Sequence, residues 1–437
     1  MSRTVIACLV CLLVAGCAAP SATPQTPAPT TAESAGANGS DTARAVEDGY
    51  DIAVSGGDLP VDYERTFVRT ERLLGANVSP PGVLIVQTQS EIESDVEPGA
   101  TPSDGSGRSF LAVMGIGQSA DDGESDGEDG DDGVTVAAYA ASGDAVYVNE
   151  QMTAAGRERA LERTLAHEFV HTAQFRQDAF RRLQRALDLR ERYSRDRYLA
   201  YASVIEGVAV YVAAAYDRRY LPGDHTSITG DERYRSADSG VKYAIARYYY
   251  GSRYLDRRFN STRNVSAVYD DPPESTEQLL HNDTDDEPAE LSVVANAGPN
   301  RTTGQVDVNG ELFSRIALGT ELNRSQAGAG ADGWGTDRLV PVDPEREAGN
   351  RSYAWATRWD APAEADEFER ALGEYLASRA ERQDGGIYRD GALTFRVERV
   401  SPETVVLLAG EEPFVRSASV RGVNESVSVT VKQEQRT

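Results

Sequence analysis

Two histidines four residues apart are the residues of this sequence best suited to do chemistry. His167 and His171 flank Glu168 in the pattern HExxH, which is a zinc-binding signature. At about 3.6 residues per turn, both imidazoles lie on one face of a helix and can hold the same metal ion. Glu168 projects near the open coordination position, where it could take a proton from a water that the metal activates. The spacing therefore predicts a metal site with a general base beside it.

Histidine is scarce in this chain. Its 437 residues include only four histidines: His167, His171, His225 and His281. Half of them fall at ligand spacing, which favours a metal site over a chance pattern. The flanking residues 164–166 and 172–173 carry no charge, as expected for a helix buried beside a cleft. The alternative interpretation is an ordinary amphipathic helix with two partly buried histidines.

A catalytic zinc site needs a third protein ligand, and Glu206 is the best candidate. It is the only charged residue in the apolar stretch 201–216, YASVIEGVAVYVAAAY. A lone carboxylate in an apolar helix must be paired or metal-bound, because burying it alone is costly or forces protonation. An ion pair with one of the many arginines is the alternative. The stretch is too short, and carries too central a charge, to predict a membrane span.

The HExxH pattern, followed 35 residues later by Glu206-Gly207 on a second helix, resembles the gluzincin metallopeptidases, whose archetype is thermolysin. The resemblance implies a zincin-like fold and one catalytic Zn²⁺ held by His167, His171 and Glu206. It also implies that Glu168 is the base and proton shuttle. Thermolysin-like members often carry an Asp four residues after the ligand Glu, and it orients the first His. Val210 stands there in this chain, so the partner of the histidines must come from elsewhere.

A narrower resemblance covers roughly residues 60–410. Several segments are similar to a family of haloarchaeal surface proteins that are described as candidate metallopeptidases. They are YYYG at 248–251, PESTEQLLH at 273–281, GWGTDR at 333–338, Trp359-Asp360 and Glu367-Phe368. The likeness implies a shared fold more firmly than a shared activity.

A peptidase also needs a donor that stabilises the oxyanion forming on the attacked carbonyl. His281 is the preferred catalytic candidate because it closes the PESTEQLLH segment. His225, in a turn-like Pro-Gly-Asp setting, is the other spare histidine. Three tyrosines compete for the same role: Tyr211, Tyr216 and Tyr220. A surface or capping position is the alternative for His281, and residues 275–278 fit a helix start capped by Ser or Thr.

The helices and strands predicted around these residues indicate an α+β fold. A helix over 61–75 is followed by short strands of a small N-terminal sheet: Val83–Gln87, Phe110–Ile116, Val134–Tyr139 and Ala145–Val148. The zinc helix is expected from about Gly156 to Leu187, before the Glu206 helix and a Tyr-rich helix over Val241–Asp256. An edge strand before the zinc helix, Val134–Tyr139 or Ala145–Val148, is expected to pair with extended substrate, or to serve only as a fold element.

The region beyond residue 290 is predicted as a C-terminal α+β lobe packed on the core. Strands are expected at Leu291–Ala295, Tyr353–Trp359, Ala392–Val397 and Thr404–Leu408, and helices at Gly310–Leu322 and Ala363–Ala380. The alternating Val427–Val431 is expected to be an edge strand or a tail. The expected division is a zincin-like catalytic core over 58–290, with an acidic insertion at 118–133, and a lobe over 291–437.

The N-terminus predicts secretion and a lipid anchor. Arg3, the apolar run Val5–Ala15 and the lipobox-like Val14–Cys17 fit a signal peptide over 1–17, with lipid on the Cys17 sulfur. A plain signal peptide or an uncleaved anchor is the alternative. Residues 18–57, rich in Ala, Thr, Pro, Ser and Gly, predict a flexible stalk. Because all three cysteines lie at or before Cys17, the mature domain can form no disulfide.

The charge balance limits the environments and the partners that suit this protein. Acidic residues outnumber basic ones 70 to 44, for a net charge of −26. A field this negative excludes nucleic acid as a partner, and molar salt screens it because the Debye length falls to about 3 Å. A halophilic, haloarchaeal protein is the economical interpretation. Asp121–Asp132 reads as a solvated acidic loop rather than an EF-hand, and sequons such as Asn260 and Asn350 predict a surface glycoprotein.

These features together predict an extracellular, membrane-tethered zinc peptidase that acts on peptides or proteins, with its oligomeric state left open. Two alternatives remain. One is a cell-surface binding protein whose zinc site is catalytically silent, and the other is a zinc hydrolase that acts on bonds other than peptide bonds.

Overall fold

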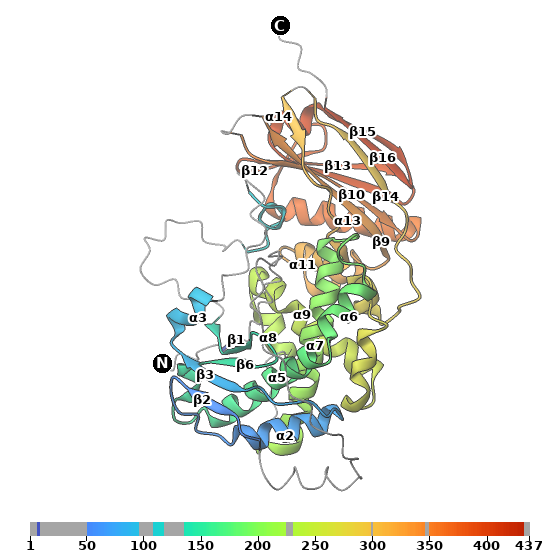
Figure 1. Cartoon of the computed structure of the whole chain (residues 1–437). Helices are drawn as coiled ribbons and strands as arrows, with labels where there is room; N and C mark the ends of the chain where they lie inside the picture. Colours follow the sequence, from blue (N-terminus) through green and yellow to red (C-terminus); the bar gives the residue numbers. More distant parts are fainter. Residues whose placement is uncertain are drawn as a thin grey trace, which may run out of the picture. The chain divides into compact units, whose positions relative to one another are not determined.

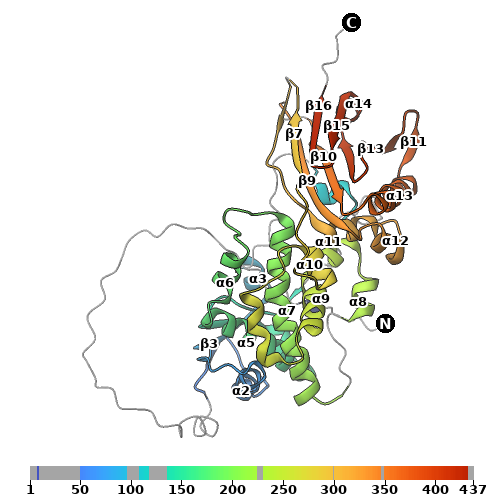
Figure 2. The same cartoon turned by 90° about the vertical axis from the view of Figure 1, so that its right-hand side faces the viewer.

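The computed structural model describes residues 7–8, 50–95, 108–117, 135–223, 230–298, 300–345 and 349–431. These residues form helices and several sheets (Figures 1 and 2), which confirms the predicted α+β class. Cys17, the stalk as far as residue 49, the acidic insertion 118–133 and His225 lie outside the described residues. The predicted end of the stalk at residue 57 is wrong, because Ala53–Ser55 form a strand that pairs with Val83–Ile85.

The chain divides into two compact units. Unit 1 comprises Met1–Ala100, Asp132–Asp178 and Val212–His225, and unit 2 comprises Thr101–Asp131, Ala179–Tyr211 and Thr226–Thr437. The division passes through one continuous helix, α7 (Arg195–Tyr220). The boundary suggested by the sequence, near residue 290, falls inside unit 2.

Unit 1 contains a four-stranded sheet in the order β2-β3-β6-β5. Its strands are β2 (Ala53–Ser55), β3 (Val83–Gln87), β6 (Ala145–Asn149) and β5 (Ala138–Ala140). The first three run parallel, whereas β5 pairs antiparallel with β6. A separate two-stranded parallel pair joins β1 (Ala7–Cys8) to β4 (Thr135–Val136). Among the described strands, β5 is thus at the edge, as expected for one of the two candidate strands, whereas the other candidate, β6, lies inside the sheet.

The HExxH sequence lies on α5 (Glu158–Arg176), which contacts other helices of unit 1. Helix α2 (Tyr63–Leu74) begins at Asp62, whose carboxylate accepts from the Arg65 amide, and ends at Gly75 in the left-handed conformation. It packs on α5 through the Phe67 and Phe169 rings, whose centroids are 5.3 Å apart. Edge strand β5 also packs against α5. The remaining helices are α3 (Gln89–Asp95) and the 3-10 helix η1 (Glu150–Thr153).

Two predicted elements are wrong. The single zinc helix over 156–187 is divided into α5 and α6 (Ala179–Ala186), because Asp178 takes a φ of 57° that an α-helix cannot continue through. The predicted strand at Phe110–Ile116 contains a short helix, α4 (Phe110–Val113). The Ser109 hydroxyl caps it by accepting from the Ala112 amide. An apolar run this short fits a buried helix as well as a strand.

The helices of unit 2 pack most closely where two glycines face each other. An ideal Cβ on Gly207 of α7 would lie 2.5 Å from the carbonyl carbon of Gly251 on α9 (Ser239–Arg258). A Cβ on Gly251 would come within 2.0 Å of the Ser203 carbonyl oxygen. The backbones of α7 and α9 therefore touch one residue away from Glu206. The other helices here are α8 (Asp231–Ser236), η2 (Thr262–Tyr269), α10 (Thr276–His281), α11 (Gly310–Leu318) and α12 (Arg324–Ala329).

Helix α7 is apolar enough to be compared with a membrane span. By length and composition alone, this helix is the one that could cross a membrane among the described residues. However, 78% of its most apolar 18-residue window is buried inside the structure. That burial is typical of the core helix of a folded domain.

A seven-stranded antiparallel sheet dominates the C-terminal part of unit 2, in the order β11-β12-β13-β14-β10-β9-β8. Its strands are β8 (Arg301–Thr303), β9 (Trp334–Pro344), β10 (Ser352–Trp359), β11 (Glu381–Gln383), β12 (Ile387–Asp390), β13 (Leu393–Ser401) and β14 (Thr404–Gly410). Helix α13 (Pro362–Arg379) packs on it, and α14 (Glu412–Ser417) follows. A three-stranded sheet of β15 (Ala418–Val423), β16 (Ser426–Val431) and β7 (Ser292–Asn296) shares an apolar core with it. Strand β16 lies between the other two, so Val427–Val431 is a central strand and not an edge strand or a tail.

Candidate metal centre

The HExxH sequence lies in the buried middle of α5. Every side chain from 164 to 174 is buried. His167 is 3% exposed, Glu168 is 0% exposed and His171 is 2% exposed. Ionisable side chains this deep in a folded protein are hydrogen-bonded or bound to a metal, because desolvation would otherwise be costly.

The ring nitrogens of the two histidines meet at the separation that a shared metal ion requires. Nε2 of His167 lies 3.1 Å from Nε2 of His171. Two nitrogen ligands of a tetrahedral zinc ion, each about 2.05 Å from it, are about 3.3 Å apart. The observed distance is close to this value. The predicted i, i+4 spacing therefore brings two nitrogen ligands to one point.

Gln174 supplies the histidine partner that the sequence did not reveal. His171 Nδ1 lies 2.6 Å from Gln174 Oε1, and Gln174 is 1% exposed. Because an amide oxygen only accepts, Nδ1 carries the proton and Nε2 is left with its lone pair for a metal. The position of the expected Asp, Val210, is only half-buried and apolar. The sequence feature that indicates this partner is a glutamine three residues after the second histidine, on the same helix face.

Gln174→Ala should therefore weaken zinc binding without abolishing it. Removing an outer partner of a ligand histidine typically lowers metal affinity about 10–100-fold. Competition of the purified protein with a chromogenic chelator would measure the change. Gln177→Ala, at the end of the same helix, is the matched control and should leave affinity unchanged. Equal affinity in Gln174→Ala and wild type would contradict this role for Gln174.

Glu206 completes a three-residue group with the histidines. One potential ligand atom from each of His167, His171 and Glu206 lies within 4.8 Å of the other two. Glu206 is 2% exposed. On α9, desolvation lowers the pKa of the buried Arg247, but the charges of Tyr248 and Glu206 outweigh it and raise that pKa above its ordinary value. Glu206 and the cationic Arg247 therefore attract each other.

Contacts within unit 1 fix the direction of the second half of α7 against α5. Arg159 of α5 pairs with Asp217 at 3.0 Å, and Glu162 accepts from the Tyr216 hydroxyl. These contacts make α7 antiparallel to α5. Glu206 precedes Asp217 by three helical turns and therefore shares its face. Three turns in the opposite direction along α5 lead from Arg159 to the turn that contains His171.

The donor set fits zinc. Two imidazole nitrogens and one carboxylate oxygen are the ligands of the catalytic sites that keep a fourth position open for water or substrate. Softer ions would favour sulfur ligands, and harder ones would favour oxygen alone. Glu168 precedes the second ligand by three residues on the same buried helix. The arrangement can thus hold one zinc ion with a carboxylate base beside it.

His281 forms a separate cluster at the end of α10. Its Nε2 lies 2.9 Å from Glu311 Oε2 and 3.3 Å from Asp332 Oδ1, and Arg315 pairs with the same two carboxylates. Ser275 caps α10 by accepting from the Gln278 amide, as predicted for this helix start. The role of His281 as oxyanion donor stays a prediction. The structure places His281 where it pairs with Glu311 when its ring is protonated.

The stability contributed by His281 should depend on pH. The hydrogen bond to Glu311 raises the pKa of His281 above its ordinary value, although burial acts in the opposite direction. The pair therefore stabilises the fold fully below the unfolded pKa, and its contribution is lost as pH rises through the raised pKa. The unfolding midpoint of wild type should exceed that of His281→Gln at about pH 6, and the difference should vanish by about pH 9. A difference independent of pH would contradict the charged pair.

The three competing tyrosines all lie on α7, and their distances along the helix separate them. At about 1.5 Å per residue, Tyr216 and Tyr220 are about 15 and 21 Å from Glu206 along the axis. Such distances are too long for a group that must touch a carbonyl near the metal. Tyr211 is about 8 Å away along the axis. Its hydroxyl donates to the Phe259 carbonyl oxygen at 2.9 Å.

Residues 300–419 match a protein-family model described as a domain of unknown function (DUF8575). The match spans just over a quarter of the chain and includes β9, β10, α13 and β14. It contains none of His167, Glu168, His171 and Glu206. No curated protein and no solved structure matches the chain.

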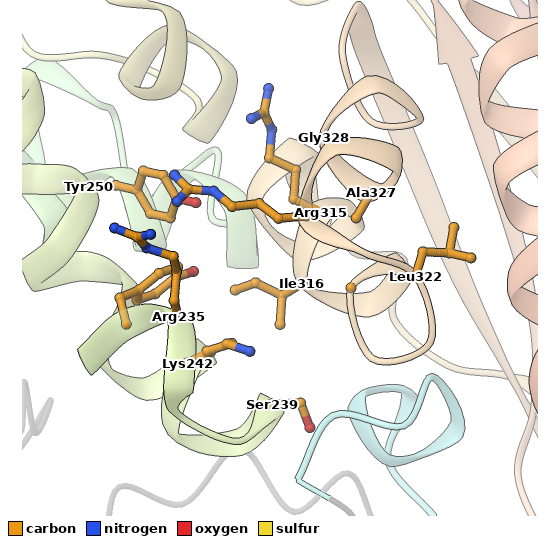
Figure 3. A pocket seen from close by; sticks show the side chains of 12 residues that line it. Arg235, Ser239, Lys242, Tyr250, Arg315, Ile316, Leu322, Ala327 and Gly328 are labelled. Carbon is orange, nitrogen blue, oxygen red and sulfur yellow. The ribbon is translucent and has the colours of Figure 1, made fainter. Parts of the chain in front are cut away.

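The DUF8575 region also contributes to a pocket of about 270 Å³ in unit 2 (Figure 3). Four cationic side chains line it: Arg235, Lys242, Arg315 and Arg324. Arg235 pairs with Asp231, and Arg315 pairs with Glu311 and Asp332. Arg324 contacts the Tyr249 hydroxyl, and Lys242 forms no ion pair with any residue that the structure describes. In a chain of net charge −26, such a pocket is suited to an anionic group.

Proposed function

We propose that this protein is a zinc-dependent peptidase of the gluzincin type, tethered to the outer face of the cell membrane by a lipid on Cys17. The observation that carries the proposal is the buried group of His167, His171 and Glu206, whose histidine nitrogens lie 3.1 Å apart. The signal-like N-terminus and the lipobox-like residues before Cys17 support the location, and the acid-rich composition supports work at high salt.

The residues divide the chemistry among them. When bound, zinc supplies a Lewis acid that polarises the scissile carbonyl and makes water acidic. Glu168 takes a proton from the attacking water and delivers it to the leaving amine. Gln174 holds His171 in the tautomer that leaves Nε2 available. Because Glu168 and both histidines are buried, the charges that develop during the reaction are screened little by solvent.

Edge strand β5 provides a way to hold the substrate. It packs against α5 in unit 1, and one of its edges is not paired within the sheet. An extended peptide can add to such an edge through backbone hydrogen bonds, with little dependence on sequence. The proposed substrate is therefore an extended peptide or an unfolded protein segment.

The experiment that tests the proposal is cleavage of a broad peptide library by the zinc-loaded protein in molar potassium chloride, read by mass spectrometry. New termini that appear with the wild type and not after zinc removal would support the proposal. Stoichiometric zinc with no cleavage of any library peptide would overturn it. Cleavage of ester or amide compounds alone would favour the zinc hydrolase that acts on other bonds.

The pocket of Figure 3 favours a second candidate, a surface protein that binds an anionic ligand. Its four cations and the rings of Tyr234 and Tyr250 would bind a carboxylate-rich peptide through direct contacts, which survive at molar salt better than long-range attraction. Calorimetry with a short oligoglutamate would test this. This function would be favoured over the peptidase if the protein binds oligoglutamate, if Lys242→Gln weakens that binding, and if the protein cleaves no peptide.

A further inference from the structure

Three carboxylates of unit 2 converge away from the zinc ligands. One oxygen from each of Glu277, Asp286 and Asp360 lies within 4.8 Å of the other two. Glu277 is the second residue of α10, Asp286 lies in the segment between α10 and β7, and Asp360 lies between β10 and α13. The segments that meet here are therefore distant in sequence. None of the three residues is used by the proposed peptidase chemistry.

The deepest of the three has no protein partner to offset its charge. Glu277 is 3% exposed. Among the residues that the structure describes, no hydrogen-bond donor and no cationic side chain lies within bonding distance of its carboxylate. Burial, followed by the charges of Glu311 and Asp360, raises the pKa of Glu277 to about 10. Burial and the charge of Asp286 likewise raise the pKa of Asp360 to about 6. An unpartnered buried carboxylate beside two others is unfavourable unless a cation joins them.

The backbone around the cluster is fixed at two points. The Asp360 amide donates to the Gly333 carbonyl oxygen at 3.0 Å, and Gln278 Nε2 donates to the Asp286 carbonyl oxygen at 2.6 Å. Gly335 leaves the necessary room, because a Cβ there would lie 2.8 Å from Asp360 Oδ1. The carboxylates are thus held together by contacts that do not use their own oxygens. The oxygens stay available for a ligand.

The chemistry of the cluster selects a hard divalent cation. Carboxylate oxygens without nitrogen or sulfur suit calcium and magnesium rather than zinc. Calcium takes six to eight oxygens at about 2.3–2.6 Å, whereas magnesium demands nearly ideal octahedral geometry at about 2.0–2.1 Å. Calcium also tolerates irregular geometry and completes its six to eight ligands with water. Asp360 is exposed and Asp286 is partly exposed, which leaves space for that water.

We propose that Glu277, Asp286 and Asp360 bind a calcium ion that ties α10 to the start of α13 within unit 2. The site is structural. It clamps the α10–β7 connection to the seven-stranded sheet, and it is independent of the zinc site and of peptidase activity.

Calcium titration of the zinc-loaded full-length protein in molar potassium chloride tests the site, with the melting temperature and the bound calcium as readouts. Calcium at about 100-fold excess over its Kd should raise the melting temperature of wild type by about 5 °C, with one ion bound per chain. Equal magnesium should raise it less. The high salt screens non-specific attraction, and zinc content is measured to confirm that it does not change.

Glu277→Gln separates a metal site from an ordinary acidic cluster. Removing one of several crowded carboxylates relieves repulsion, so without calcium this variant should melt at or above the wild-type temperature. With calcium it should show no rise, and Asp360→Asn should behave in the same way. Asp285→Asn, at the exposed residue next to Asp286, is the matched control and should keep the full rise. No rise in wild type, or the same rise in Asp360→Asn and Asp285→Asn, would overturn the proposal.

Discussion

Glu168→Gln should abolish peptide cleavage while leaving one zinc ion per chain. The substitution keeps the size and the hydrogen-bonding groups of the side chain but removes its ability to take a proton. Positioned acid–base groups typically contribute about 10²–10⁴-fold to rate, so kcat should fall by at least about 100-fold. KM should change little because the zinc ligands and β5 are untouched. Quantitative mass spectrometry of a cleaved library peptide measures the rate, and elemental analysis of the same sample measures zinc.

Glu158→Gln is the matched control for that experiment. Glu158 lies on the exposed first turn of α5, where backbone hydrogen bonds of the helix start lower its pKa. It is the same substitution on the same helix, far from the histidines, and cleavage should be unchanged. Unaltered cleavage by Glu168→Gln would refute its role as base. Loss of zinc together with activity would show that Glu168 acts on the metal rather than on the proton.

Glu206→Ala should lose zinc. The carboxylate is one of the three proposed ligands, and its removal leaves two nitrogens 3.1 Å apart without the third member of this group. The loss of affinity should exceed the 10–100-fold expected for an outer partner such as Gln174. Because a bound metal stabilises the folded state by mass action, the melting temperature in excess zinc should fall as well. Chelator competition and thermal unfolding measure the two effects.

Val210→Ala provides the comparison on the same helix. Val210 lies one turn after Glu206, is half-buried and has no ligand atom. Its zinc affinity should equal that of wild type. Zinc affinity that is unchanged in Glu206→Ala would refute the third ligand and would favour an ion pair as the reason for a carboxylate in this apolar helix.

The sequence contained enough to predict the candidate metal ligands and most of the regular elements near them. Helical periodicity placed His167 and His171 on one face, and an isolated charge marked Glu206. Both signals are local, because they depend only on residue type and helix geometry. The same holds for Val83–Gln87, which was predicted with the bounds of β3, and for Ser275 as the cap of α10.

The parts that were missed depend on contacts between distant segments. The role of Gln174 follows from the structure, in which its amide oxygen lies 2.6 Å from His171 Nδ1, because glutamine is not a typical partner of a ligand histidine in a sequence motif. Strand β9 was not predicted because a run that includes Gly335, Asp337 and Arg338 lacks strand alternation, and only its partners β8 and β10 fix it. The break at Asp178 depends on a positive φ, which an aspartate tolerates but which its presence in a sequence does not predict. The carboxylate cluster joins residues up to 83 positions apart.

The most direct test of the account is X-ray absorption at the zinc edge on the purified wild-type protein in molar salt. We expect one zinc ion per chain, with two nitrogen neighbours at about 2.0 Å from histidine and light oxygen neighbours at a similar distance. In the His167→Ala, His171→Ala double variant this signal should be lost. A wild-type protein without zinc, or zinc that persists in the double variant, would contradict the central claim that His167, His171 and Glu206 form a metal centre.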